Sequence, residues 1–230
     1  YVGCGVLASA LCMDKVVQKQ LCLQQGIPTV PFVWTDKFSY QQDKKQIITG
    51  INQKLHYPIF VKPANQGSSV GVAKINDQTE LASGIDQAFQ YDTKIILEQA
   101  IENVREIECS VLGNHQPKAS VLGEIKSSNE FYDYDAKYVD GKSTSTIPSL
   151  LPKTITAQIQ QLAVKAFTLL NCSGLARVDF LVNGKTLDVF LNELNTMPGF
   201  TSISMYPKLW AASGLSYPAL LEELIHLALE

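Results

Sequence analysis

Apolar residues recur at helical spacing in several long stretches of the chain. The first stretch, LASALCMDKVVQKQLCLQQ, has an apolar side and ends where Gly26 and Pro28 follow. Asp77 and Glu80 have the spacing of a capping box and predict the start of another helix. We therefore expect helices at residues 7–25, 44–55, 78–90, 154–170 and 215–229.

Shorter apolar or alternating runs lie between these stretches and predict β-strands. The pair Asn183–Gly184, between the last two runs, is typical of a tight turn joining neighbouring strands. The runs are IPTVPFVW (27–34), YPIFVKP (57–63), VGVAKI (70–75), KIILEQA (94–100), IECSVLG (107–113), ASVLGEI (119–125), ARVDFLV (176–182) and LDVFLNEL (187–194). Helices and strands in this arrangement predict an α+β fold.

The chain is predicted to form two lobes that meet near residue 100, where the run KIILEQA ends. Residues 1–99 would form the first lobe and residues 100–230 the second. Within the second lobe, residues 127–150 are polar with few apolar anchors. A loop of that length inside a compact domain is usually functional or mobile.

Composition narrows the class of protein. The chain has 230 residues, of which 46% are hydrophobic and 18% charged, as in ordinary soluble globular proteins. Its net charge of −3 gives no electrostatic case for binding nucleic acid or an anionic membrane, and no apolar run reaches the length of a membrane span. The chain opens at Tyr1 without an initiator methionine or a signal-peptide pattern, so we expect a longer parent chain.

The five cysteines are odd in number, scattered along the chain and form no CxxC pair. This pattern favours reduced thiols in a cytoplasm, used mainly as small core residues. The three histidines are equally scattered, so a zinc site is not expected.

Lys62 ends an apolar strand run, where it would lose solvation and favour an anionic partner. A GSSVG loop follows at residues 67–71, and glycines with hydroxyls expose backbone N–H groups that suit phosphate oxygens. A surface lysine and an ordinary glycine loop would explain either feature alone. Their adjacency adds phosphate binding as an alternative, and both explanations stay open.

ARVDF and LNELN place polar side chains within very apolar strand runs. Arg177 and Asp179 stand two residues apart and share a strand face, as do Glu193 and Asn195. If the register sets these faces on the same side, two carboxylates and an amide converge. Such hard oxygen ligands suit Mg²⁺, which prefers to bind together with substrate phosphates. A solvated strand face is the alternative explanation.

Glu98 ends an apolar strand at the seam between the predicted lobes, a common position for a ligand site. An acid and the neighbouring amide of Gln99 could bind an adenine amino group or a ribose hydroxyl, although Glu98 could also simply cap the strand. Glu106 and Glu108 share a strand face beyond the seam. One of them could reach a ribose, or Arg105 could pair with either on the surface.

The segment FYDYDAKY, residues 131–138, places Lys137 between tyrosines in the long polar stretch. It could close over a charged ligand as a lid that excludes water. A solvated loop is the alternative.

In this order, the motifs resemble the D-alanine–D-alanine ligases, a branch of the ATP-grasp superfamily. The motifs are YVGCGVLASALCMDK, VKPANQGSSVG, FYDYDAKY, GLARVDF and NELNTMPGFTSIS. The resemblance covers nearly the whole chain, and the combination is far more specific than any single motif. It implies the central and C-terminal domains of a three-domain ligase, with ATP held between two sheets. We expect the family's N-terminal domain, which contacts the first D-alanine, to lie outside this chain.

The resemblance also implies roles for individual residues. Those implied to contact ATP are Lys15, Lys62, Glu98, Gln99, Glu106, Lys137 and Asn192, with Gln99 standing where some relatives carry a lysine. Those implied to hold two Mg²⁺ ions, with Mn²⁺ as an alternative, are Asp179, Glu193 and Asn195. Those implied to stabilise an oxyanion are Arg177 and the Gly199 backbone N–H, and those implied to surround the second substrate are Ser68, Tyr138, Ser204 and Met205.

The implied reaction forms D-alanyl-D-alanine for bacterial cell-wall synthesis. ATP would phosphorylate the carboxylate of one D-alanine, and the amine of a second D-alanine would attack the acyl phosphate. Phosphoryl transfer needs positioning and charge neutralisation more than a protein nucleophile. The family is cytoplasmic and often dimeric. One rival is a D-alanine–D-lactate ligase, which Tyr138 argues against, and another is a different ATP-grasp carboxylate–amine ligase, which FYDYDAKY and NTMPGFTSIS argue against. A nucleotide-binding fragment without turnover is the rival from another class.

Overall fold

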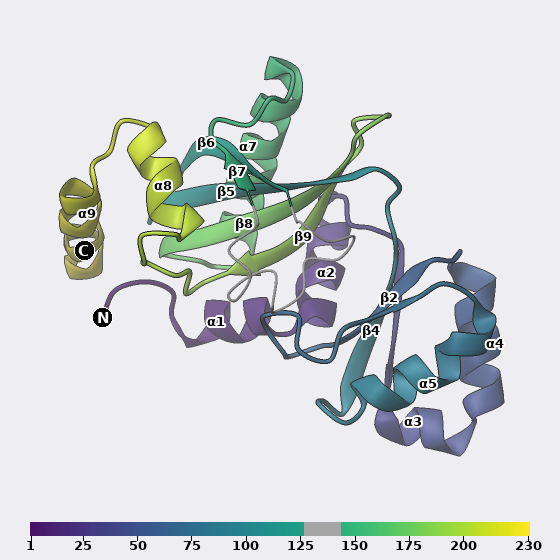
Figure 1. Cartoon of the computed structure of the whole chain (residues 1–230). Coiled ribbons are helices and arrows are strands. Elements are labelled where there is room, and N and C mark those ends of the chain that lie inside the picture. Colours follow the sequence, from purple (N-terminus) through teal and green to yellow (C-terminus); the bar gives the residue numbers. More distant parts are fainter. Residues whose placement is uncertain (127–143) are drawn as a thin grey trace.

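Two antiparallel sheets organise the chain (Figure 1). The computed structural model describes residues 1–126 and 144–230, and both sheets lie within them. The small sheet, in the order β1-β4-β2-β3, consists of β1 (Phe32–Asp36), β2 (Ile59–Pro63), β3 (Ala73–Ile75) and β4 (Lys94–Gln99). The large sheet, in the order β7-β6-β5-β8-β9, consists of β5 (Val104–Gly113), β6 (Lys118–Lys126), β7 (Thr144–Thr146), β8 (Gly174–Asn183) and β9 (Val189–Asn195).

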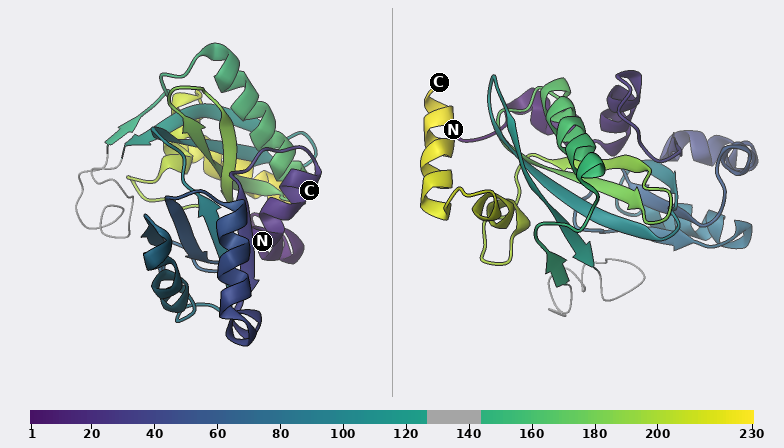
Figure 2. Two further views of the ribbon diagram at one scale, coloured as in Figure 1. Left: turned by 90° about the vertical axis from the view of Figure 1, so that its right-hand side faces the viewer. Right: turned by 90° about the horizontal axis from the view of Figure 1, so that it is seen from above.

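Helices pack on both sheets. The helices that cover the small sheet on the side away from the large sheet are α3 (Lys37–Gln42), α4 (Lys44–Lys54) and α5 (Gln78–Ala88) (Figure 1). The helices that pack on the large sheet are α1 (Val6–Met13), α2 (Lys15–Gln24), α7 (Lys153–Leu169), α8 (Met205–Ala212) and α9 (Tyr217–Leu229). Figure 2 shows α7 lying along one face of the large sheet. Among the described residues, no helix combines the length and apolar character that crossing a bilayer requires.

Side-chain alternation in the small sheet separates a core face from a polar face. Val61 of β2 and Leu97 of β4 are fully buried and pack with Ile85 of α5. Because successive side chains on a strand point to opposite faces, Lys62 and Glu98 lie on the other side. That side faces α2, whose Val16 packs on Ile96 and Ala64.

The large sheet is divided in the same way. Val178, Phe180 and Leu191 join the core beneath α7, which contributes the fully buried Phe167. Both α1 and α2 add residues to this core, including Ala8, Cys12 and Cys22. The opposite face carries the polar residues of ARVDF and LNELN, so the alternation seen in the sequence becomes a difference between two faces of one sheet.

The prediction of one continuous helix over residues 7–25 is wrong. The helix is interrupted at Asp14, which has an extended backbone and separates α1 from α2. Asp14 Oδ1 accepts hydrogen bonds from the backbone N–H groups of Val16 at 2.9 Å and Val17 at 3.1 Å. The carboxylate therefore caps the first turn of α2, a local bond that hydrophobic periodicity does not reveal.

The other predicted helices are confirmed as α4, α5, α7 and α9, and each predicted strand run overlaps one of the strands β1 to β6, β8 and β9. Two runs are shortened, because β2 begins at Ile59 after Pro58, and β3 covers only Ala73–Ile75. The sequence interpretation missed α3 and α8, which are short and lie between stronger signals. It also missed β7, at Thr144–Thr146, which lies within the stretch of residues 127–150 predicted to be a loop. The α+β fold is confirmed. The lobes of residues 1–99 and 100–230 stay a prediction.

Truncating the large core should destabilise the chain far more than truncating a surface aromatic residue. Phe167→Ala should lower the free energy of unfolding by roughly 3–5 kcal/mol, because Phe167 is fully buried in α7. Phe38→Ala is the matched control, since Phe38 is 71% exposed in α3 and its loss should cost less than about 0.5 kcal/mol. Urea denaturation followed by circular dichroism measures both variants. Equal losses would contradict this assignment of the core.

Candidate active site

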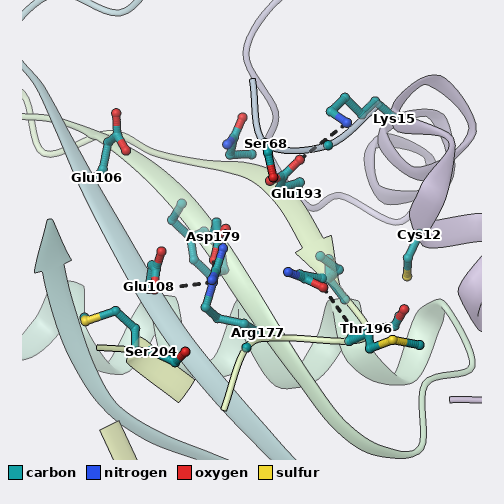
Figure 3. Close-up of a pocket in the computed structure, with 18 of the residues that line it drawn as sticks. Cys12, Lys15, Ser68, Glu106, Glu108, Arg177, Asp179, Glu193, Thr196 and Ser204 are labelled. Carbon is teal, nitrogen blue, oxygen red and sulfur yellow. Dashed lines mark hydrogen bonds and ion pairs between the residues drawn. The ribbon is translucent and has the colours of Figure 1, made fainter. Parts of the chain in front are cut away.

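A cavity of about 760 Å³ lies over the polar face of the large sheet (Figure 3). A smaller cavity of about 160 Å³ adjoins it on the side of the small sheet. The two share part of their lining, including Lys15, Ser68 and Glu193. Every predicted site residue that the structure describes lines one cavity or the other. Lys137 and Tyr138 lie outside the described residues.

The strand register brings the predicted metal ligands to one face. Asp179 of β8 stands opposite Glu193 of β9, and Arg177 stands opposite Asn195. On the other side of β8, Glu108 of β5 stands opposite Asp179. Three carboxylates therefore form a row across three strands, with Arg177 in the adjacent row. The condition stated from the sequence, that both polar faces lie on the same side, is met.

A β-bulge in β9 sharpens this arrangement. The pairing of β8 with β9 shifts between Asp179 and Phe180, because Phe180 stands opposite Leu191 and leaves Asn192 as an extra residue. Asn192 and Glu193 are consecutive, yet both are half-buried and both line the cavities. Bulges re-aim side chains in this way next to active sites.

Arg177 is paired with the carboxylates around it. Its Nε and Nη2 donate to Asp179 Oδ1 and Oδ2 at 2.7 and 2.6 Å, and its Nε lies 3.3 Å from Glu108 Oε2. Burial disfavours the charged guanidinium, but the carboxylates of Asp179 and Glu108 outweigh burial and raise the pKa of Arg177 well above its ordinary value. This cation is held in place before any ligand binds.

The predicted metal ligands have suitable oxygen atoms, but each already has a partner. Asp179 is held by Arg177, Glu193 lies 3.6 Å from Lys15 Nζ, and Asn195 Oδ1 accepts from the Met197 N–H at 3.0 Å. Among the described residues, no three acidic, cysteine or histidine side chains are close enough to hold a metal ion. The donor chemistry fits a hard cation such as Mg²⁺. Binding would require these side chains to exchange partners, and the metal assignment stays a prediction.

Lys15 lies at the start of α2 and faces both cavities. Its Nζ donates to the Gln66 backbone carbonyl at 2.6 Å, just before the GSSVG loop. In that loop Ser68 and Ser69 have left-handed backbones, with φ of 51° and 61°. Gly71 also has a positive φ, and a Cβ there would collide with the Tyr91 ring. The loop is therefore a tight, specifically shaped element beside a lysine.

The smaller cavity is lined by Lys62 and Glu98, which form part of a buried group of three charges. Glu98 Oε2 lies 2.5 Å from Lys62 Nζ, and Glu98 Oε1 lies 2.8 Å from Lys19 Nζ. Burial by itself would raise the pKa of Glu98, but the two lysines lower it to about 2. Burial opposes the charge on Lys62 as well, and Glu98 raises the pKa of Lys62 above its ordinary value.

Sequence reasoning missed Lys19 as a member of the site. Its signal was its position, because Lys19 lies three residues from both Val16 and Cys22 and so falls on the buried side of α2. Glu108 was noted in the sequence but not assigned to the site. Gln18 was also missed; it is fully buried and joins α2 to β9 by accepting from the Leu194 N–H at 3.2 Å.

At the other end of the large cavity, Gly199 and Ser204 lie close together. A Cβ on Gly199 would come within 2.7 Å of Ser204 Oγ, so this approach requires glycine. Ser204 Oγ in turn accepts from the Thr201 N–H at 3.0 Å. The loop after β9 is thereby folded back on itself where it lines the large cavity.

Neutralising Glu98 should destabilise the chain in a pH-dependent way. Glu98→Gln should cost roughly 3–5 kcal/mol of stability at neutral pH, because it leaves two buried lysines without their anion. In the folded chain the pKa of Glu98 is about 2, below its ordinary value of 4.5. Its stabilisation is therefore complete above pH 4.5 and is lost as the pH falls toward 2.

Thermal unfolding across this pH range tests that expectation. The difference in Tm between the unaltered chain and Glu98→Gln should become smaller as the pH falls. Glu222→Gln, at an exposed position on α9, is the control and should follow the unaltered chain at every pH. A difference in Tm that stays constant across this pH range would contradict the ion pairs of Glu98.

Comparison with known proteins agrees with this geometry. The sequence model of the family described as D-ala D-ala ligase C-terminus matches residues 21–226. A D-alanine–D-alanine ligase from Acetivibrio thermocellus is 52% identical over 230 residues, which are 100% of this chain and 61% of that protein. One from Caldicellulosiruptor bescii is 53% identical over 100% of this chain and 63% of that protein. The chain thus spans about three-fifths of the length of these relatives.

Solved structures give the same result. The D-alanine–D-alanine ligase from Coxiella burnetii is 40% identical, with a TM-score of 0.83 over 99% of this chain and 60% of that one. The VanG D-Ala:D-Ser ligase from Enterococcus faecalis is 36% identical, with a TM-score of 0.87 over 98% of this chain and 64% of that one. The two sheets and the cavities over their polar faces form an ATP-grasp fold, and the chain belongs to the D-alanine–D-alanine ligase family.

Proposed function

We propose that this chain is the nucleotide-holding and ligating part of an enzyme that joins two D-alanines. The reaction would use ATP to form D-alanyl-D-alanine, ADP and phosphate, and would supply precursors for peptidoglycan. The observation that carries the proposal is the polar face of the large sheet. There Arg177, Asp179, Glu193 and Asn195 stand in register over one cavity, with Lys15 and Lys62 at its border with the small sheet.

The lysines and the glycine loop would hold the phosphates of ATP. Lys15 lies beside Glu193, and the loop at Ser68 lines both cavities. A left-handed backbone at consecutive residues turns N–H groups toward a common side, which suits phosphate oxygens. Lys137 would add a further positive charge, as the family resemblance implies. By the same family resemblance, we assign contacts with the adenine base to Glu98 and Gln99, and a contact with the ribose to Glu106.

Asp179, Glu193 and Asn195, with Asn192 beside them, would lie against magnesium and the phosphates it carries. Two Mg²⁺ ions, or Mn²⁺ in their place, would neutralise phosphate charge during transfer. On this proposal Glu193 gives up its contact with Lys15, which frees Lys15 for a phosphate oxygen. Asp179 would share its carboxylate between Arg177 and the metal.

Arg177 would stabilise the oxyanion that forms when the second amine attacks the acyl phosphate. A fixed cation needs little reorganisation at that moment, and its carboxylate partners supply the fixation. The Gly199 N–H would donate to the same oxygen. Ser68, Ser204 and Tyr138 would bind and orient the second D-alanine, with Met205 at the edge of its pocket. Closure over the site would keep water from the acyl phosphate.

The proposed second substrate, D-alanine, has two alternatives. The likeness to a D-Ala:D-Ser ligase supports D-serine as an alternative acceptor, and D-lactate is a second one. Tyr138 favours D-alanine by resemblance to the family. The partners we propose are ATP, D-alanine and a second copy of the same protein in a homodimer. A reaction that consumes ATP places the enzyme in the cytoplasm.

Phosphate release from ATP and magnesium chloride, with D-alanine present or withheld, tests the function. Two proteins are compared, this chain alone and this chain joined to the part of the Acetivibrio thermocellus relative that lies outside the match. Release that requires D-alanine in the joined protein would support the ligase. Stronger phosphate release with D-serine or D-lactate would make that compound, and not D-alanine, the second substrate. Absence of any acceptor-dependent release would refute the proposal.

Removing one carboxylate of the row should abolish turnover without unfolding the chain. Glu193→Gln should lower acceptor-dependent phosphate release in the joined protein by about 10²-fold or more, because a carboxylate that would hold magnesium is lost. Glu102→Gln is the control, since Glu102 is exposed and outside both cavities. Circular dichroism checks that both variants are folded. Full activity in Glu193→Gln would remove Glu193 from the metal site.

A further inference from the structure

Lys19 is a buried cation that lines neither cavity. Its side chain is 1% exposed, and its Nζ lies 2.8 Å from Glu98 Oε1. It also donates to the Leu191 backbone carbonyl at 3.4 Å. No ligand in the cavities can reach it directly, so any effect on ligand binding must pass through Glu98 or through β9.

The charges around Lys19 do not cancel in pairs. Glu98 carries one negative charge and contacts two lysines, Lys19 on one oxygen and Lys62 on the other. The Glu98 side chain is 2% exposed, so its charge is balanced by these neighbours more than by water. Glu193 of β9 also favours the charged form of Lys19, although burial is the largest influence and lowers its pKa. The group of three therefore carries a net charge of +1.

Of the two lysines, only Lys62 presents its positive charge to a cavity. Lys62 is 17% exposed and lines the smaller cavity, whereas Lys19 is enclosed by protein. Without Lys19, Lys62 and Glu98 would form a neutral pair beside the cavity. A neutral pair attracts an anion far less than a lysine whose carboxylate partner is already balanced from behind.

We propose that Lys19 is a positioning residue that offsets the charge of Glu98 and so leaves the positive charge of Lys62 available to a phosphate of the nucleotide. The inference rests on the nucleotide site proposed above and adds to it a residue outside both cavities. It assigns Lys19 an electrostatic role, not a contact with the ligand.

The same residue joins the two sheets at the site. Glu98 lies on β4 of the small sheet, and Leu191 lies on β9 of the large sheet, next to the bulge at Asn192. Lys19 reaches both from α2. Through these two contacts, Lys19 sets the distance between the Glu98–Lys62 pair and β9, the strand that bears Glu193.

A double-variant cycle separates this electrostatic role from simple packing. Lys19→Met keeps a long side chain but removes the charge, whereas Lys19→Met combined with Glu98→Gln removes one cation and one anion. The double variant restores the net charge of +1, now carried by Lys62 alone, which is 17% exposed and lines the smaller cavity. The readout is the ratio of the affinity for ATP to the affinity for adenosine, measured on this chain by isothermal titration calorimetry.

The ratio isolates the phosphates, because any change in contacts to the base or ribose affects both ligands. In Lys19→Met the ratio should fall about tenfold, the effect of one charged contact. In the double variant it should return to within about threefold of the unaltered chain. If Lys19→Met does not fold, the double variant still tests the proposal through the same recovery.

Three results would overturn the inference. An unchanged ratio in Lys19→Met, beside normal ATP binding by the unaltered chain, would refute the role of Lys19 alone. A folded double variant that keeps a low ratio would show that Lys19 acts through packing and not through charge. Failure of the unaltered chain to bind ATP would refute the proposed nucleotide site and the inference with it.

Discussion

The register between β5, β8 and β9 is the constraint on which the candidate site depends. Because side chains alternate along each strand, one register places Glu108, Asp179 and Glu193 in a row, and a shift by one residue would send part of that row into the core. The apolar side chains beneath α7, including Phe180 and Leu191, hold the register by burying their own face. Packing on one side of the sheet thus determines the chemistry on the other.

Charge compensation is the second common feature of the site. Arg177 is paired with Asp179 and Glu108, Lys15 lies beside Glu193, and Glu98 contacts two lysines. Removing charged groups from water is costly unless partners are at hand. A charged ligand entering these cavities meets ions that are already oriented, so binding can exchange the partners of ions that are in place. This property suits a site for a highly charged substrate such as ATP.

Helix α2 connects these features. It begins where Asp14 ends α1, and its first residue, Lys15, faces both cavities. Farther along, Gln18 bonds to β9 of the large sheet and Lys19 bonds to Glu98 of the small sheet. A single capping carboxylate therefore sets the direction of a helix that joins both sheets and carries a lysine into the site.

The sequence by itself determined the types of the longer elements, because hydrophobic periodicity and strand alternation are local properties of the chain. It also indicated, through the two-residue spacing of Arg177 with Asp179 and of Glu193 with Asn195, that polar groups share strand faces. The division of α1 from α2 depended on side-chain bonding by Asp14, which periodicity does not report. Only the tertiary structure decided three further features. They are the register of β8 with β9, the bulge at Asn192 and the burial of Lys19 against Glu98. The contact of Lys19 with Glu98 joins residues far apart in the sequence, and the register of β8 on β9 depends on which side chains the core buries, so both depend on how whole sheets and helices pack.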